Sequence, residues 1–176
     1  SQAHVGLALE AAEKSMTLLQ NDDQTLPFAK SVRKVAVIGK LGNRANIGDH
    51  GSSRVHPPYV VTPLEGIRRL LPDAEVVYDD GTDIRKASAL AQTSDAVVFV
   101  VGYDHDDEGE RISSRTSEFK SGGDRQSLGL HADEIELLTA AGLLNRRSVA
   151  VLIGGSTILI EEWRRSVAAI LMAYYP

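Results

Sequence analysis

The chain has 176 residues, 43% of them apolar and 24% charged, which is typical of one soluble globular domain with a substantial core. Its net charge of -5 argues against nucleic acid as a partner, because phosphate backbones require a surplus of Lys and Arg on one face. No apolar run approaches the length of a membrane helix, and the first residues lack a signal-peptide pattern, so we expect no membrane partner. With no cysteine, disulfides and thiolate metal sites are excluded, while the compartment (cytoplasmic or secreted) and the oligomeric state stay open.

The first part of the chain predicts a helix, a linker and one buried strand. Residues 3–15 have helical composition with an apolar stripe, and with the linker they make an N-terminal segment over residues 1–30. Residues 35–39 are continuously apolar, which is typical of a buried strand. A long loop rich in glycine and serine follows at residues 40–58.

The middle part predicts two helices alternating with two strands. Thr62 can cap a helix that has Pro63 at its first position. The apolar side of that helix is expected to be Leu64, Ile67 and Leu71. A strand is predicted at residues 75–78, a helix at 83–93 and a further buried strand at 96–101.

The last part predicts one amphipathic helix and two more buried strands. The helix covers residues 131–147, and the strands cover 149–153 and 168–172, with an ambiguous segment at 158–165. The inward side chains of the helix are expected to be Ile135, Leu138 and Leu144. Apolar strands that alternate with helices indicate a three-layer α/β sandwich, in which helices enclose a mostly parallel sheet of about five to six strands. Residues 1–176 are expected to form this single domain, excised from a longer protein, because the chain starts at Ser1 and stops directly after an apolar run.

A dense acidic loop leaves the strand at 96–101. Its carboxylates are Asp104, Asp106, Asp107, Glu108 and Glu110, with His105 among them. Carboxylates this close disfavour one another's ionised form, so such a loop can hold one carboxylic acid neutral near pH 7, as a general acid requires. In parallel sheets ligands bind beyond the carboxyl ends of the strands, and both long loops, 40–58 and 103–130, start there.

Three other kinds of site fit the sequence less well. A dinucleotide fold needs three glycines at its first turn, and the segment Gly39-Lys40-Leu41-Gly42 lacks one of them. A calcium loop that starts at Asp104 has a glycine in sixth place but Arg115 in twelfth, where a glutamate belongs. A serine hydrolase needs G-x-S-x-G, which Gly154-Gly155-Ser156 does not continue. A non-catalytic module that binds a nucleotide or a metal therefore remains the alternative, and the favoured interpretation needs neither a cofactor nor a metal.

An acid on a loop suits glycoside hydrolysis, which uses one carboxylic acid and a second carboxylate as nucleophile or base. At this point the ordered motifs add a resemblance to the second, C-terminal domain of glycoside hydrolase family 3, the β-glucosidase and β-xylosidase family. The segments that carry it, in chain order, are residues 12–22 (AEKSMTLLQND) with Leu26-Pro27, 35–39 (VAVIG), 48–55 (GDHGSSRV), 62–66 (TPLEG), 95–102 running into 108–110 (EGE), 123–125 (GDR) and 173–176 (AYYP).

This resemblance implies a retaining β-glycosidase that acts on terminal β-linked sugars, with the active site between a TIM-type barrel and this sandwich domain. The barrel, which is absent from this chain, would belong to the same polypeptide and supply the aspartate nucleophile, so the isolated chain is expected to be inactive. The sandwich would supply the acid/base glutamate, which by match is Glu110, with Glu108 as the alternative. Arg111, next to Glu110, would favour the ionised form of Glu110, whereas Asp106, Asp107 and Glu108 would oppose it.

The candidate substrate-binding residues are Asp49 and Arg54 in the loop at 40–58, and Asp124 and Arg125 after the acidic loop. Two interpretations of the loop at 40–58 stay open: Asp49 and Arg54 line the aglycone side of the site, or the loop is a plain Gly/Ser turn. Relatives often pass directly from Glu-Gly to Asp-Arg, whereas residues 111–122 intervene here. The insertion leaves two questions open: which glutamate is the acid/base, and whether Asp124 and Arg125 contact the sugar or brace the loop.

Overall fold

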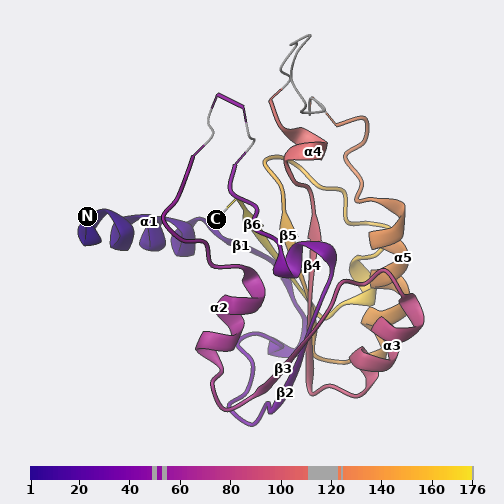
Figure 1. The fold of residues 1–176 in the computed structure, drawn as a ribbon. Helices are drawn as coiled ribbons and strands as arrows, with labels where there is room; N and C mark the ends of the chain where they lie inside the picture. The colour runs from indigo at the N-terminus through magenta and orange to yellow at the C-terminus, as the bar shows by residue number, and fades with distance from the viewer. Residues whose placement is uncertain (49–50, 53–54, 111–122, 124, 176) are drawn as a thin grey trace.

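The protein is a six-stranded sheet with helices on both faces, in a computed structural model that describes residues 1–48, 51–52, 55–110, 123 and 125–175 (Figure 1). The strands are β1 (Thr17–Asn21), β2 (Lys34–Ile38), β3 (Glu75–Asp79), β4 (Ala96–Gly102), β5 (Ser148–Ile153) and β6 (Ala169–Tyr174). Their order across the sheet is β1-β6-β5-β4-β2-β3. Only β1 runs antiparallel to its neighbour, β6, and the other strand pairs are parallel. The predicted fold class, a mostly parallel α/β sandwich, is therefore confirmed.

The helices form the outer layers of the sandwich. They are α1 (Gln2–Ser15), α2 (Pro63–Leu70), α3 (Ile84–Gln92), the single turn α4 (His105–Glu108) and α5 (Ala132–Ala141). Figure 1 shows α3 and α5 on one face of the sheet and α2 on the other. The Thr62 hydroxyl accepts the Glu65 N–H at the start of α2, and Pro63 holds the first helical position, as the sequence predicts. Within the described residues, no helix is long and apolar enough to cross a membrane.

Two apolar clusters bind these layers together, because the side chains of each strand alternate between the faces of the sheet. Along β4, Phe99 packs toward α3 and α5, whereas Val98 and Val100 pack toward Leu64 of α2. Trp163 is 1% exposed and belongs to the first cluster. The second face is covered less completely, and a cavity of about 660 Å³ remains there between the loop after β2 and strands β5 and β6.

Three local predictions differ from the structure. The apolar run after α1 forms β1, because the edge of β6 offers backbone partners that sequence cannot show. The helix predicted at 131–147 ends at Ala141 and tightens into a 3-10 turn, which leaves Leu144 43% exposed, while Leu137 faces the core instead. His105, expected in a loop, begins α4. Helix α1 has no buried residue, so its apolar stripe lies open among the described residues.

The end of β4 requires glycine. Gly102 has φ +129°, in the region that other residues rarely adopt, and a Cβ there would overlap the Ile153 carbonyl oxygen of β5. We therefore expect Gly102→Ala to lower the free energy of unfolding by at least about 3 kcal/mol, measured by urea denaturation.

The matched control for this substitution is Gly66→Ala inside α2. Its new methyl group would meet only the Val61 side chain, at 3.8 Å. Because alanine is the better helix former, we expect a gain of about 0.5–1 kcal/mol. Equal effects of the two substitutions would contradict this account of the end of β4.

Candidate active site

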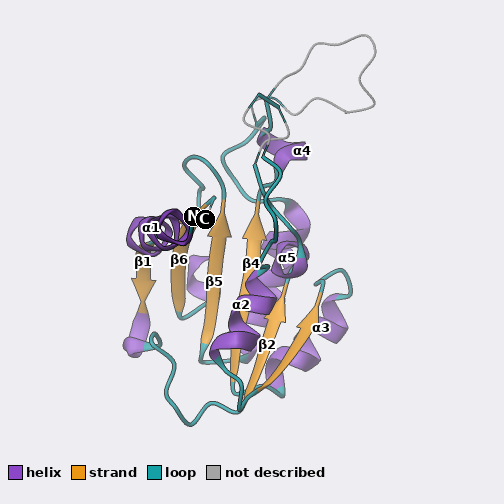
Figure 2. Cartoon of the chain, turned by 60° about the vertical axis from the view of Figure 1, so that its left-hand side comes forward, coloured by secondary structure: helices purple, strands orange, loops and turns teal. Residues whose placement is uncertain are grey.

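Strands β2, β4, β5 and β6 end at the same edge of the sheet, and the described candidate residues Glu108, Glu110 and Arg125 lie in the loops beyond it. Figure 2 shows α4 above the tips of β4 and β5, with loops from the neighbouring strands beside it. Ligands in parallel α/β sheets bind at this edge, where the strand order reverses. The reversal here lies between β4 and β2, because β3 follows β2 on one side whereas β4 returns to its other side.

The acidic residues after β4 begin by capping α4. The Asp104 carboxylate accepts the Asp106 N–H at 2.8 Å, and the Asp107 carboxylate accepts the Asp104 N–H at 3.1 Å. This reciprocal capping satisfies backbone donors at the start of the turn. Two members of the acidic run are therefore committed to local structure.

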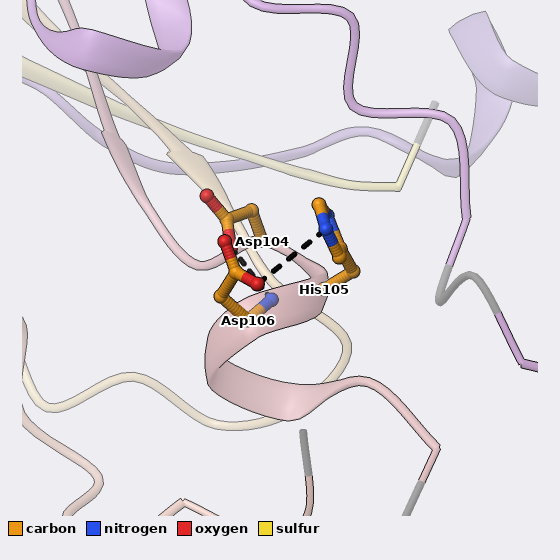
Figure 3. A group of neighbouring side chains, drawn as sticks. All are labelled: Asp104, His105 and Asp106. Atoms are coloured by element: carbon orange, nitrogen blue, oxygen red, sulfur yellow. Dashed lines mark hydrogen bonds and ion pairs between the residues drawn. The ribbon is translucent and has the colours of Figure 1, made fainter. Parts of the chain in front are cut away.

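Arg44, from the loop after β2, neutralises the carboxylates at the start of α4. Its guanidinium pairs with Asp104 and, at 3.3 Å, with Asp106. Figure 3 shows that Asp104, His105 and Asp106 lie together, and their ligand atoms are within 4.8 Å of one another, as a cation site requires. The guanidinium already supplies the positive charge at two of these three residues, so a metal ion would have to compete with it.

The side chain of Glu108 is largely enclosed, with only 12% of it exposed. One carboxylate oxygen, Oε2, pairs with Arg125 Nε at 2.8 Å. The other, Oε1, accepts the Gly155 N–H at 2.5 Å and the hydroxyl of Tyr175. Burial, and then the hydrogen bond to Glu108, raise the pKa of the Tyr175 hydroxyl. Glu108 is thus held between groups that follow β5 and β6.

Glu110 lies two residues further along and faces a different partner. It is exposed, and its carboxylate accepts the backbone N–H of Ser52 in the loop after β2. The backbone of Gly51 lies against the same side chain. The two long loops of the carboxyl edge, predicted separately from sequence, therefore meet at Glu110.

The structure thus separates the predicted site residues. Glu108 and Arg125 are in direct contact, whereas Glu110 contacts the loop after β2. Asp49, Arg54 and Asp124 lie outside the described residues. Charges from elsewhere in the chain meet the acidic residues: Asp104, Asp106 and Glu108 each have an arginine partner, and Asp107 lies 3.0 Å from His131.

Sequence analysis did not assign functions to Arg44, Tyr175 or Glu134. Tyr175 belongs to the AYYP motif, which contributes to the family resemblance but indicates no role for the tyrosine. The sequence does contain one sign that Glu134 is buried. It shares a helix face with Leu137, Leu138 and Ala141, at spacings of three, four and seven residues. Nothing in the sequence joins Arg44 to Asp104, since sixty residues separate them.

A polar crevice of about 290 Å³ lies between the carboxyl ends of β2 and β4. Glu134 of α5 lines it, and its Oε1 accepts the Gly102 N–H at 3.0 Å. Its Oε2 is buried without a hydrogen-bond partner among the described residues. Burial raises the pKa of Glu134 to about 7, whereas the ion pair between Lys40 and Asp133, at 2.5 Å, lowers the pKa of Asp133.

The fold and this edge define an α/β sandwich domain with an acidic loop at the carboxyl end of β4. A family model described as the glycosyl hydrolase family 3 C-terminal domain matches residues 16–176, and the chain belongs to this family. A β-xylosidase from Formosa agariphila is 32% identical over 98% of the chain, and the thermostable β-glucosidase B from Acetivibrio thermocellus is 30% identical over 98%.

Among solved structures, a β-glucosidase from Erythrobacter marinus superposes on the whole chain with a TM-score of 0.85 and 30% identity. The chain spans 24% of the β-xylosidase, 22% of the thermostable β-glucosidase and 27% of the Erythrobacter chain. It therefore corresponds to one domain of these longer glycosidases.

Glu134 should make stability depend on pH. Because its pKa is about 7 in the folded protein and 4.5 as the ordinary value, the folded state binds more protons over that window. The contribution of Glu134 is therefore complete below pH 4.5 and decreases by up to about 3 kcal/mol as the pH rises through 7.

We expect Glu134→Gln to remove this dependence and to be more stable than the wild type at pH 8, measured by urea unfolding between pH 4 and 8. Glu136→Gln, on the exposed face of the same helix, should leave the wild-type profile unchanged. A wild-type profile retained by Glu134→Gln would show that another group causes the dependence.

Proposed function

We propose that this chain is the sandwich domain of a retaining β-glycosidase and that it supplies the acid/base carboxylate from the loop after β4. The observation that carries the proposal is a pair of glutamates at the carboxyl edge, one held and one exposed, in a member of glycoside hydrolase family 3. Relatives named as β-xylosidases and β-glucosidases support terminal β-linked xylosides or glucosides as the substrate class.

Glu110 is the better of the two acids on geometric grounds. A general acid must come within about 2.6–3.2 Å of the oxygen that it protonates. The exposed side chain of Glu110 can be approached from solvent or from another domain. Glu108 is 12% exposed and binds three donors, so it could approach a substrate only after breaking those contacts.

The proposed reaction has two steps. In the first, Glu110 gives its proton to the glycosidic oxygen as the bond from that oxygen to the anomeric carbon breaks, and a carboxylate of the barrel domain bonds to the same carbon. In the second, the ionised Glu110 takes a proton from water, whose oxygen displaces the barrel carboxylate. The sugar leaves with its original anomeric configuration, and Glu110 is protonated again.

The remaining site residues keep narrower proposed roles. Asp49, Arg54 and Asp124 are proposed to contact the substrate or its leaving group. Arg125 was predicted to bind substrate or to brace the loop, and its 7% exposed side chain behind Glu108 favours the bracing role.

The polar crevice does not favour the alternative of a nucleotide-binding module. Although it lies at the strand reversal, five carboxylates line it against the two cations Lys40 and Arg44. Both cations are already paired with carboxylates. A phosphate would therefore meet net negative charge, which opposes its binding.

The missing nucleophile can be tested directly. We expect the isolated chain to show no hydrolysis of 4-nitrophenyl β-xyloside or β-glucoside above background, because only one of the two required carboxylates is present. The full-length polypeptide should hydrolyse at least one of them. Turnover by the isolated chain would contradict a nucleophile outside it.

The acid/base assignment can be tested by chemical rescue in the full-length protein. We expect Glu110→Ala to lower the rate on a disaccharide by about 10²–10⁴-fold, the usual contribution of a general acid. Azide should then restore turnover of a 2,4-dinitrophenyl glycoside and form a β-glycosyl azide, because azide needs no base.

Glu108→Ala and Glu136→Ala are the comparison variants, the second on the exposed face of α5. Neither should give the azide product. The azide product from Glu108→Ala alone would transfer the acid/base role to Glu108.

A further inference from the structure

Arg125 is a buried cation that connects three segments at the carboxyl edge. Its Nε pairs with Glu108 at 2.8 Å, and its Nη2 donates to the Thr157 carbonyl oxygen at 3.0 Å and to the Ser156 hydroxyl. Its guanidinium also lies over the ring of Tyr103, 4.1 Å from the ring centre. Tyr103 follows β4 and Thr157 follows β5, so the one side chain bridges both loops.

Glu108 extends this connection to β6. The carboxylate oxygen that does not face Arg125 accepts from Gly155, after β5, and from the hydroxyl of Tyr175, after β6. Glycine suits this close approach, because a Cβ on Gly155 would lie 3.0 Å from the Tyr175 ring and 3.4 Å from the Glu108 oxygen, so those side chains would have to shift slightly. The segment Gly154-Gly155-Ser156, which does not complete a serine hydrolase motif, therefore forms part of the binding site for the Glu108 carboxylate.

Stability alone gives a weak reason for such a pair. Buried ion pairs often contribute no more than apolar side chains of the same volume, because desolvation offsets their attraction. Arg125 also keeps one buried nitrogen, Nη1, without a hydrogen-bond partner among the described residues. The ion pair does, however, fix the position of the Glu108 carboxylate.

We propose that Arg125 is a positioning residue for the acid/base, acting through Glu108. Glu108 and Glu110 are separated by Gly109 alone, which is buried, so their Cα atoms are at most about 7 Å apart. A carboxylate held from β4, β5 and β6 therefore fixes the stretch of backbone that presents Glu110. This inference rests on the proposed function, because it assumes that the loop after β4 carries the acid.

The test uses the full-length protein with Arg125→Lys, which keeps the charge but loses the planar fork, and Arg85→Lys as the control on the exposed surface of α3. kcat/KM is measured on a disaccharide, whose leaving group needs full protonation, and on a 2,4-dinitrophenyl glycoside, whose leaving group needs little. A misplacement near 1 Å costs about 10²-fold, so we expect that loss on the disaccharide and less than about 3-fold loss on the aryl glycoside.

A purely structural role would lower both rates together with the melting temperature, and equal losses on the two substrates would overturn the proposal. If Arg125→Lys does not fold, Tyr175→Phe removes only one hydroxyl from Glu108, and we expect a loss of about 10-fold confined to the disaccharide. An unchanged ratio of the two rates in Tyr175→Phe would also count against positioning.

Glu110→Ala and Arg125→Lys together distinguish failure of the positioning role from failure of the acid/base assignment. Dependence on the leaving group in Glu110→Ala but not in Arg125→Lys would overturn the positioning role alone. The same dependence in Arg125→Lys but not in Glu110→Ala would overturn Glu110 as the acid and support Arg125 as the partner of a catalytic Glu108.

Discussion

The complete burial of β4 is the constraint on which the rest of the structure depends. All seven of its residues are buried, and it is paired on both sides, with β2 and with β5. No charged side chain can lie along such a strand without a large desolvation cost. The chain therefore carries its charges immediately beyond Gly102, where the sheet ends and several loops can supply counter-charges.

Two arginines from outside α4 supply those counter-charges, one at each end of the helix. Arg44 holds the start of α4 from the side of β2, and Arg125 holds its end from the side of β5. Between these two arginine contacts the backbone of the loop is held to both halves of the sheet. Glu110 comes just after the contact with Arg125, so its backbone is supported while its side chain stays exposed.

Glu134, on α5 and outside the acidic loop, has a pKa that is raised to about 7, chiefly because the carboxyl group is buried. The acidic run is paired with arginines from elsewhere in the chain, whereas the buried Glu134 carboxylate accepts the Gly102 N–H and keeps its Oε2 without a hydrogen-bond partner among the described residues.

The sequence by itself determined the layers of this protein. Continuous apolar runs identified five of the six strands, and Thr62-Pro63 located the start of α2, because burial on two faces and helix capping are local requirements. The ordered motifs also indicated the family. Tertiary structure alone decided the pairing of β1 with β6, the end of α5 and the contacts of the two glutamates. These depend on partners that are distant in the chain: Arg125 reaches Glu108 across an insertion, and Tyr175 reaches it from just beyond the last strand. No spacing rule connects such residues, because their distance is set by the order of strands in the sheet.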